Sequence, residues 1–445
     1  LKKLRVILRK GVVMNEIAKG MNKVLREKDP VIFSLLSNFG KEIYMPKGII
    51  SQSAEAKLHA YECNATIGIA KEDGGPMYLP SIKKFFINLT PSEIFPYATP
   101  YGLPELRKLW QEKIISENEL KNKELSLPVV THAMTNGLML TGDLFIDKGD
   151  EIYLPNMMWG NYNLIYRIRY KAKIINYDFF DSSLTKFNVA ALKKALKSCR
   201  KEKIVLLFNF PNNPTGYTPT KKEADAIKEV LFDLAESGKK ILVVVDDAYY
   251  GLSFEDNLIE GSIFSKFVGL HPNIVAVKLD GFTKEFYVWG FRIGFLTFGN
   301  YQQNKEVYDV MEKKTAAAIR CSVSNCSHPA QSICLKILSE GHYKKEKEQK
   351  YKKLKDRAEK VKEIVYNQKF KKLWDVYPFN SGYFMCLRLK GVDSNKVRVH
   401  ALKEYGIGTI SIGKQDLRIA FSSVKTAQLE KLFDFLAKSI RELKS

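Results

Sequence analysis

The stretch KIVLLFNFPNNPTG, residues 203–216, carries an unbroken apolar run directly into a turn rich in proline, asparagine and glycine. A run this short and this apolar is typical of a strand buried on both faces of a parallel sheet. Two further runs of the same kind follow, KILVVVDD (240–247) and NIVAVKL (273–279). The helix-like segment 221–238 separates the first two. The pattern therefore predicts successive strands joined by helical crossovers.

The same alternation continues on the N-terminal side of this stretch. EIYLP (151–155) and KIINY (173–177) are predicted strands, and FNVAALKKALKSC (187–199) is a predicted helix. Short β-branched runs that alternate with helices indicate a mostly parallel sheet covered on both faces. We therefore predict an α/β core of about 250 residues.

The pattern changes after residue 380 and indicates a second, smaller unit. GYFMCLRL (382–389) and DLRIAFS (416–422) are predicted strands, and AQLEKLFDFLAKSIREL (427–443) is an amphipathic helix. The predicted fold class is α/β, with a mostly parallel central sheet flanked by helices and a smaller α+β domain. We expect three parts: an N-terminal arm with a segment that joins the small domain (1–85), a large α/β domain (86–345), and a small C-terminal domain (346–445).

The net charge of +22 is unusual, because 71 Lys and Arg residues face 49 Asp and Glu residues. A surplus of this size makes a nucleic-acid-binding regulator one alternative. Two segments hold most of it: 344–372 has thirteen basic and five acidic residues, and 1–28 has nine and two. Charges along a long predicted helix at 341–375 form a solvated face, and residues 1–30 are too few for a helix-turn-helix domain. We expect no nucleic-acid partner.

Membrane and secreted classes are also disfavoured. No run approaches the 18 or so apolar residues that a membrane-spanning helix needs, so no membrane partner is expected. The basic N-terminus lacks a clean apolar core with a cleavage site, so we expect no signal peptide. An alternative is that Met14 is the natural start and residues 1–13 are extra. The six cysteines have neither zinc-ligand spacing nor a disulfide pattern, which predicts no metal and a reducing cytoplasm.

Polar turns follow three successive predicted strands, at the edge where an open parallel sheet binds its ligands. NNPTG (212–216) follows the first strand, DDAYYG (246–251) the second, and DGFTK (280–284), with Arg292 beyond it, the third. Each turn alone has an ordinary explanation: a tight turn, a helix cap or a solvated lysine. Their order after successive strands predicts one common site.

This ordered set resembles the aspartate aminotransferase family, pyridoxal-phosphate enzymes of fold type I. NNPTG, DDAYYG and TKEFYVWGFRIG (283–294) match the family's three strongest signatures, including the Lys284-to-Arg292 interval. The resemblance covers roughly residues 30–445. It continues in NATIGIAKEDGGPMYLPSI (64–82), YATPYGLPELR (97–107), PNMMWGNYNLIY (155–166), AAIRCSVSN (317–325) and DLRIAF (416–421).

The resemblance implies pyridoxal 5′-phosphate as the cofactor and assigns its ring contacts. Lys284 would form the Schiff base and, once freed, act as the general base on the substrate α-proton. A buried carboxylate keeps the pyridine nitrogen protonated; Asp247 is close, but the D-x-A-Y spacing selects Asp246. Asn213 and Tyr249 would hydrogen-bond the ring phenolate, and Trp159 would stack on the ring.

The same resemblance assigns the phosphate contacts. Arg292 offers a bidentate fork, Thr283 offers a hydroxyl, and Thr135 and Asn136 lie in a loop whose N–H groups open a helix. Tyr97 and Ser324 would reach the phosphate from the neighbouring subunit, so the implied assembly is a homodimer with shared active sites. Two positions depart from the family pattern: Met134 and Gly281 each replace a usual serine.

Two arginines are implied in substrate binding. Arg418 would pair with the α-carboxylate, with Asn213 and the backbone at Gly68 beside it, and Arg320 would clamp a distal carboxylate from the partner subunit. The predicted reaction is a ping-pong transfer of the amino group from an L-amino acid, with aspartate favoured, to a 2-oxo acid, with 2-oxoglutarate favoured. The alternatives are an aromatic or broad-specificity aminotransferase, and a lyase or decarboxylase on the same fold.

Overall fold

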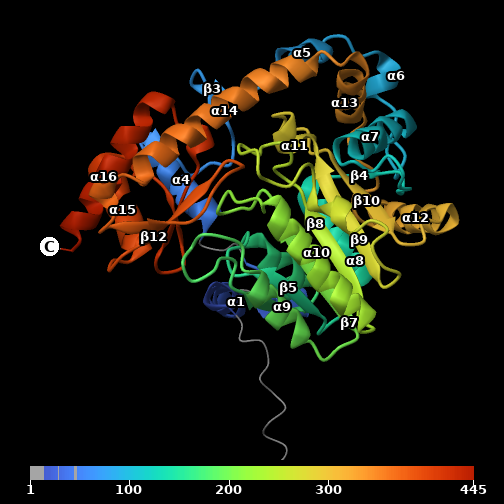
Figure 1. The fold of residues 1–445 in the computed structure, drawn as a ribbon, viewed down its shortest axis with the longest axis horizontal. Helices are drawn as coiled ribbons and strands as arrows, with labels where there is room; N and C mark the ends of the chain where they lie inside the picture. The colour runs from blue at the N-terminus through green and yellow to red at the C-terminus, as the bar shows by residue number, and fades with distance from the viewer. Residues whose placement is uncertain (1–14, 29, 45–47, 445) are drawn as a thin grey trace, which may run out of the picture.

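The computed structural model describes residues 15–28, 30–44 and 48–444. The alternative start at Met14 and the segment 1–13 lie outside the described residues. Figure 1 shows two parts side by side, a large one around the central sheet and a smaller one that holds the C-terminal helices. Within the described ranges, none of the helices is long and apolar enough to cross a membrane.

Seven strands form the central sheet, in the order β4-β10-β9-β8-β7-β5-β6. Strands β6, β5, β7, β8 and β9 run parallel, and β10 is antiparallel to both β9 and β4. The prediction of a mostly parallel sheet is confirmed, and all five predicted strands of the core form. The bounds are β4 Val129–Thr131, β5 Glu151–Pro155, β6 Lys173–Tyr177, β7 Lys203–Asn209, β8 Lys240–Asp246, β9 Ile274–Gly281 and β10 Gly294–Asn300.

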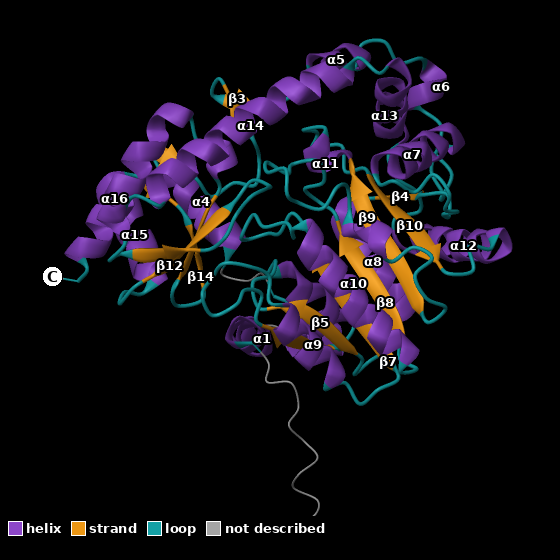
Figure 2. Cartoon of the chain, viewed as in Figure 1, coloured by secondary structure: helices purple, strands orange, loops and turns teal. Residues whose placement is uncertain are grey.

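Helices cover both faces of this sheet (Figure 2). Successive residues of β8 alternate between two apolar clusters, as a strand buried on both faces requires. Ile241, Val243 and Val245 belong to the cluster that includes residues of α9 and α10, whereas Leu242 and Val244 belong to the cluster that includes residues of α8. The helices of this part are α7 Pro104–Glu117, α8 Ala133–Phe145, α9 Val189–Lys197, α10 Lys221–Glu236, α12 Lys305–Ser322 and α13 His328–Glu340.

The smaller part is built on a four-stranded antiparallel sheet, in the order β11-β12-β15-β14. An N-terminal segment joins it, because β1 (Cys63–Asn64) pairs with β13 (Ile407–Gly408). The blue helix α4 lies among the red and orange C-terminal helices in Figure 1. The further elements are α4 Ile49–His59, α14 Tyr343–Val365, β11 Trp374–Val376, β12 Met385–Leu389, α15 Ser394–Tyr405, β14 Ile410–Ile412, β15 Asp416–Ile419 and α16 Leu429–Glu442.

The long helix predicted over 341–375 is shorter in the structure. It ends at Val365, after which the Asn367 side chain caps a 3-10 turn and β11 begins at Trp374. The chain therefore turns into the small sheet where continuous helix was expected. The remaining short elements are α1 Glu16–Lys28, α2 Pro30–Leu35, α3 Asn38–Glu42, β2 Lys71–Glu72, β3 Gly75–Pro76, α5 Pro80–Phe85, α6 Pro91–Ile94, the π-helix η1 Asn163–Arg169, α11 Phe282–Glu285, and 3-10 turns at Ile263–Lys266, Gln368–Phe370, Phe421–Ser423 and Thr426–Gln428.

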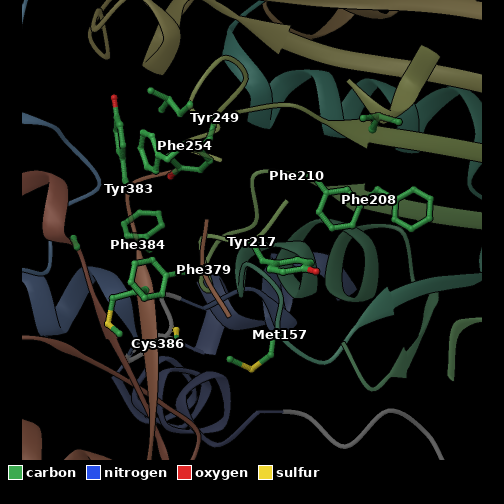
Figure 3. Close-up of a cluster of buried hydrophobic side chains, with 14 of the residues drawn as sticks. Met157, Phe208, Phe210, Tyr217, Tyr249, Phe254, Phe379, Tyr383, Phe384 and Cys386 are labelled. Carbon is green, nitrogen blue, oxygen red and sulfur yellow. The ribbon is translucent and has the colours of Figure 1, made fainter. Parts of the chain in front are cut away.

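Buried aromatic side chains join the two sheets. Figure 3 shows rings near the ends of the central strands, such as Phe208 and Tyr249, and rings from the segment just before β12, such as Tyr383 and Phe384. The ring of Tyr249 makes edge-on contacts with Tyr383, at 5.3 Å between centroids, and with Phe384, at 5.5 Å. These contacts fix the carboxyl edge of the central sheet against the small sheet, which leaves the expected ligand site at their junction.

Candidate active site

A cavity of about 240 Å³ lies at the carboxyl ends of β7, β8 and β9. Parallel strands end at one edge of the sheet, so residues distant in sequence converge there. Among its lining residues are these that the sequence analysis singled out: Thr135, Trp159, Asn213, Asp246, Tyr249, Thr283, Lys284 and Arg292. The wall also includes Ala133, Met134, Tyr162, Asn209 and Ala248.

Lys284 lies on α11, the one-turn helix that follows β9. Its amine is 4.9 Å from the centre of the Tyr249 ring, and the Tyr383 hydroxyl donates a hydrogen bond of 3.2 Å to its backbone oxygen. Burial lowers the pKa of this amine to about 8; Asp246 opposes the shift and Arg292 adds to it. A larger fraction of Lys284 is therefore neutral and nucleophilic near pH 7 than of an exposed lysine.

Asp246 and Asp247 point to different surroundings at the end of β8. Asp246 lines the cavity, is 3% exposed and accepts a hydrogen bond of 2.7 Å from the Tyr162 hydroxyl. Asp247 pairs instead with the Lys278 ammonium and the Ser262 hydroxyl. Burial raises the pKa of Asp246, and the hydrogen bond from Tyr162 partly offsets it. Of these two aspartates, Asp246 is the one placed to hold a cationic ring nitrogen in the cavity.

Tyr162 is a residue of the site that the sequence analysis missed. It directly precedes η1, and π-helical turns are rare and often mark functional sites. Its fully buried ring contacts Trp159 edge-on at 5.5 Å between centroids. The available signal was its place in the WGNY segment. No local pattern shows that its hydroxyl reaches a carboxylate 84 residues further along the chain.

Arg418 stands beside the cavity on β15 with one donor unused. It is 2% exposed, and its two terminal nitrogens donate to the Asn213 side-chain oxygen (3.1 Å) and the Thr66 carbonyl (3.0 Å). Its Nε is buried with no partner among the described residues. The guanidinium lies 4.3 Å from the centre of the Phe384 ring. A Cβ on Gly68 would lie 3.4 Å from Cζ of the same ring, so the glycine backbone lies close to it. An arginine held in this way is suited to binding a carboxylate. Phe384 is a second residue that the sequence analysis missed.

Another part of the cavity wall offers donors for a phosphate. Arg292 lines it, and the Thr283 hydroxyl is buried without a hydrogen-bond partner among the described residues. The wall also contains Ala133, Met134 and Thr135 from the first turn of α8, where backbone N–H groups are free of intrahelical partners. A guanidinium, an orphaned hydroxyl and a helix N-terminus together fit the phosphate of the implied cofactor.

The structure explains the two departures from the family pattern. The Met134 side chain packs into the apolar cluster on the α8 face of the sheet, where it adds to the hydrophobic core. A Cβ at Gly281 would lie 2.6 Å from the Cα of Gly294, so a serine does not fit there. Asn136 is not part of the cavity wall; its amide oxygen accepts a hydrogen bond of 3.0 Å from the His132 N–H.

Tyr97, Arg320 and Ser324 also lie outside the cavity wall of their own chain. Tyr97 is 90% exposed, and Arg320 donates a 2.5 Å hydrogen bond to Ser324 at the exposed end of α12. None of the three lines the cavity. These are the residues expected to act across a subunit boundary, and their outward placement is compatible with that expectation.

Comparison with known families and sequences points in the same direction. A family model described as aminotransferase class I and II matches residues 66–436. A probable aspartate aminotransferase of Methanocaldococcus jannaschii is 26% identical over 211 residues, which cover 47% of this chain and 51% of that protein. An aspartate aminotransferase of Musicola paradisiaca is 26% identical over 229 residues, 50% of this chain and 52% of that protein. The chain thus spans about half the length of these curated relatives.

Solved structures share the fold over nearly the whole chain. An aminotransferase from Anaerococcus prevotii has a TM-score of 0.80 and 25% identity, and the match covers 91% of this chain and 98% of that one. A kynurenine aminotransferase from Pyrococcus horikoshii has a TM-score of 0.77 and 18% identity, covering 93% and 98%.

Proposed function

This chain belongs to the class I and II aminotransferases, and from that membership we propose that it moves the amino group of an L-amino acid to a 2-oxo acid. The observation that carries the proposal is the meeting of three groups at one cavity. Lys284 and Asp246 line it, and Arg418 stands beside it with an unused donor. These are a nucleophilic amine, a buried carboxylate and a carboxylate-binding cation.

The cofactor of this family is pyridoxal 5′-phosphate, which supplies an electron-accepting ring when a bond at the substrate α-carbon breaks. Arg292, Thr283 and the first turn of α8 would bind its phosphate, and Asp246 would pair with its ring nitrogen. Asn213 would donate to the ring oxygen through its amide nitrogen, because its amide oxygen already accepts from Arg418. Tyr249 would donate beside it, and Trp159 would cover one face of the ring.

Lys284 would hold the cofactor covalently between turnovers, and its freed amine would carry a proton from the substrate α-carbon. Its lowered pKa supports this role, because a base that works near neutral pH must lose its proton there. Arg418 would orient the substrate through its α-carboxylate. The first product leaves before the second substrate binds, which gives ping-pong kinetics.

Aspartate and 2-oxoglutarate are the substrates that we propose, with Arg320 of the partner subunit holding the distal carboxylate. Neutral amino acids would leave that guanidinium without its partner. The second candidate is an aromatic or broad-specificity aminotransferase. It is favoured by the rings of Trp159, Tyr249 and Phe384 around the cavity and Arg418, which suit a flat apolar side chain.

An amino-donor panel with 2-oxoglutarate tests the proposed function. We expect Arg320→Ala to lower kcat/KM for aspartate by about 100-fold while phenylalanine turnover changes little. Lys314→Ala removes another exposed cation of α12 and should leave both donors unchanged. Equal losses for aspartate and phenylalanine would reject the role of Arg320. A ¹⁵N-labelled amino donor should give labelled glutamate. Release of ammonia or CO2 without labelled glutamate would reject transamination and favour the hypothesis of a lyase or decarboxylase.

We also propose a homodimer with shared sites, a cytoplasmic location, and the three-part division 1–85, 86–345 and 346–445. The dimer is supported by exposed apolar side chains at Tyr78, Phe86, Ile87, Phe95 and Tyr97. The location is supported by the six free cysteines. The division is supported by the two sheets and by the pairing of the N-terminal segment with the small one.

A further inference from the structure

A group of buried charged residues lies next to Lys284, outside the cavity. Glu285, the next residue in the chain, is 2% exposed and does not line the cavity. Its Oε1 is 2.8 Å from the Lys113 ammonium and also contacts the ammonium of Lys347. Lys113 in turn pairs with Glu117 at 2.6 Å. These four residues are here called the Glu285 cluster.

The cluster joins three elements. Glu285 belongs to α11, Lys113 to α7 beside the central sheet, and Lys347 to α14, the helix that leads to the small sheet. In Figure 1, α14 runs along the top of the molecule from the α5 end towards the small part, with α11 below it. One carboxylate therefore ties the lysine-bearing turn to both parts of the molecule.

A second buried group lies next to this cluster. The centre of the Tyr250 ring is 4.9 Å from the Lys113 ammonium and 4.6 Å from the Lys278 ammonium. Lys278 pairs with Asp247 and, at 3.2 Å, with Asp280. Both residues that the proposed chemistry uses, Lys284 and Asp246, thus have a sequence neighbour held in a buried ion pair outside the cavity.

Burying these charges is costly, and a buried ion pair is weak evidence of stability. Such a pair does restrict geometry, because the carboxylate accepts its ammonium partners from fixed directions only. The restriction matters for α11, which is a single turn of four residues and has few hydrogen bonds of its own. Burial works to raise the pKa of Glu285, but Lys113 and Lys347 outweigh it and keep the carboxylate ionised.

Contacts outside the Glu285 cluster hold helix α14 in place, so the position of Lys347 is fixed independently of Glu285. Lys350 and Lys353 both contact Glu72, and the Glu346 carboxylate accepts hydrogen bonds from the Ser81 N–H and hydroxyl. Arg357 donates to the carbonyl of Ser422 at 2.6 Å. Lys350, Lys353 and Arg357 of this helix therefore bind the segment that follows Gly68.

We propose that Glu285 is a positioning residue, which holds the Lys284 amine in the cavity by fixing α11 to Lys113 and Lys347. The proposal rests on the proposed function of Lys284. It makes the placement of the lysine depend on the placement of α14. Loss of the Glu285 carboxylate should leave the fold and the position of Arg418 unchanged and should misplace the Lys284 amine.

The test measures how fast the cofactor-free protein captures added pyridoxal phosphate at pH 8, followed by absorbance, and then kcat and KM of the loaded enzyme. We expect Glu285→Gln to slow capture and lower kcat by about tenfold or more. KM for the amino acid should change by less than about twofold, because Arg418 is untouched. Glu285→Asp should recover a large part of both rates, since it restores the charge.

Two lysine variants distinguish a specific effect on Lys284 from a general loss of structure. Lys347→Met keeps the pair between Glu285 and Lys113 and should slow capture in the same direction by a smaller factor. Lys352→Met breaks an exposed pair with Glu348 on the same helix and should change nothing. The proposal would be overturned if Glu285→Gln captured pyridoxal phosphate at the wild-type rate. It would also be overturned if Lys347→Met and Lys352→Met slowed capture equally. Because capture does not need turnover, a wild type that captures cofactor but transfers no amino group would refute the proposed function alone.

Discussion

Burial shifts the pKa values of two ionisable residues of the cavity, Lys284 and Asp246, in opposite senses. Burial disfavours the ammonium form of Lys284 and the carboxylate form of Asp246, so the first pKa falls and the second rises. The Tyr162 hydroxyl offsets part of the shift at Asp246. Pairs of groups separated in this way are typical of sites that perform acid–base chemistry near neutral pH.

The rate at which Lys284 captures pyridoxal phosphate should therefore rise between pH 7 and 9. The neutral amine is the nucleophile, so the rate follows deprotonation and should level off above the pKa of about 8. Absorbance at a series of pH values gives the inflection. An inflection near the ordinary lysine value of 10.5 would show that the amine is not held in this environment.

Among single residues, the sequence predicts those site residues that lie at the end of a strand or in the turn directly after it. Lys284 and Asp246 belong to this class, and the alternation of side chains along β8 is the physical reason that Asp246 and Asp247 differ. Tyr162 and Phe384 were not predicted, because their contacts with Asp246 and Arg418 are made between distant segments. No pattern along a single segment carries that information.

At the scale of elements, close backbone approach decides which residue types the site can use. Gly281 and Gly294 face each other across the β9–β10 pair, and a Cβ on Gly281 would overlap its neighbour. Gly216, with φ of 73°, closes the NNPTG turn, and a Cβ there would lie 2.0 Å from the Phe384 carbonyl oxygen. Both glycines let one strand end pack directly on another backbone.

Gly281→Ser should destabilise the protein even though it restores the residue usual in the family. Overpacking of this kind costs about 2 kcal/mol, and the new hydroxyl should bring no gain in cofactor affinity. Urea unfolding measures the free energy of unfolding. The matched control is Gly290→Ser, where a Cβ meets nothing within 4 Å and a change below about 0.5 kcal/mol is expected. A Gly281→Ser protein as stable as the wild type would contradict the packing argument.

The elements themselves were predictable where the apolar pattern is long and regular. The five parallel strands fall within such runs, whereas β4 has only three residues and β10 contains Gly294 and Gly299. Neither of these two strands has a clear signal, so the antiparallel edge of the sheet was not foreseen. The end of α14 at Val365 was also missed, because the charged pattern continues past the residue where the chain turns.

At the scale of the whole molecule, the site depends on contacts between parts. Asn213 lies in the turn after β7 and Arg418 lies on β15 of the small sheet, and their side chains meet at 3.1 Å. The position that we propose for the substrate carboxylate is therefore complete only when the small sheet is docked. Tyr97 and Arg320 lie outside the cavity of their own chain. Under the proposed function, a second copy completes the site with these residues.

Mixing two inactive variants tests this sharing. Lys284→Ala chains lack the amine, and Arg320→Ala chains lack the distal clamp, so neither homodimer should turn over aspartate well. A hybrid dimer contains one site with both groups intact. Co-refolded mixtures should therefore regain aspartate turnover, with a mass twice that of one chain by light scattering. A mixture no more active than its separate components would show that each chain builds its site alone.

The most direct test of the central claim is to reduce the cofactor-loaded protein with borohydride and map the modified peptide by mass spectrometry. We expect the pyridoxal-phosphate mass on Lys284 and on no other lysine, because this amine lines the cavity beside Asp246 and Arg292. Label on another residue, such as the buried Lys278 at the same edge of the sheet, or a protein that takes up no label, would contradict it.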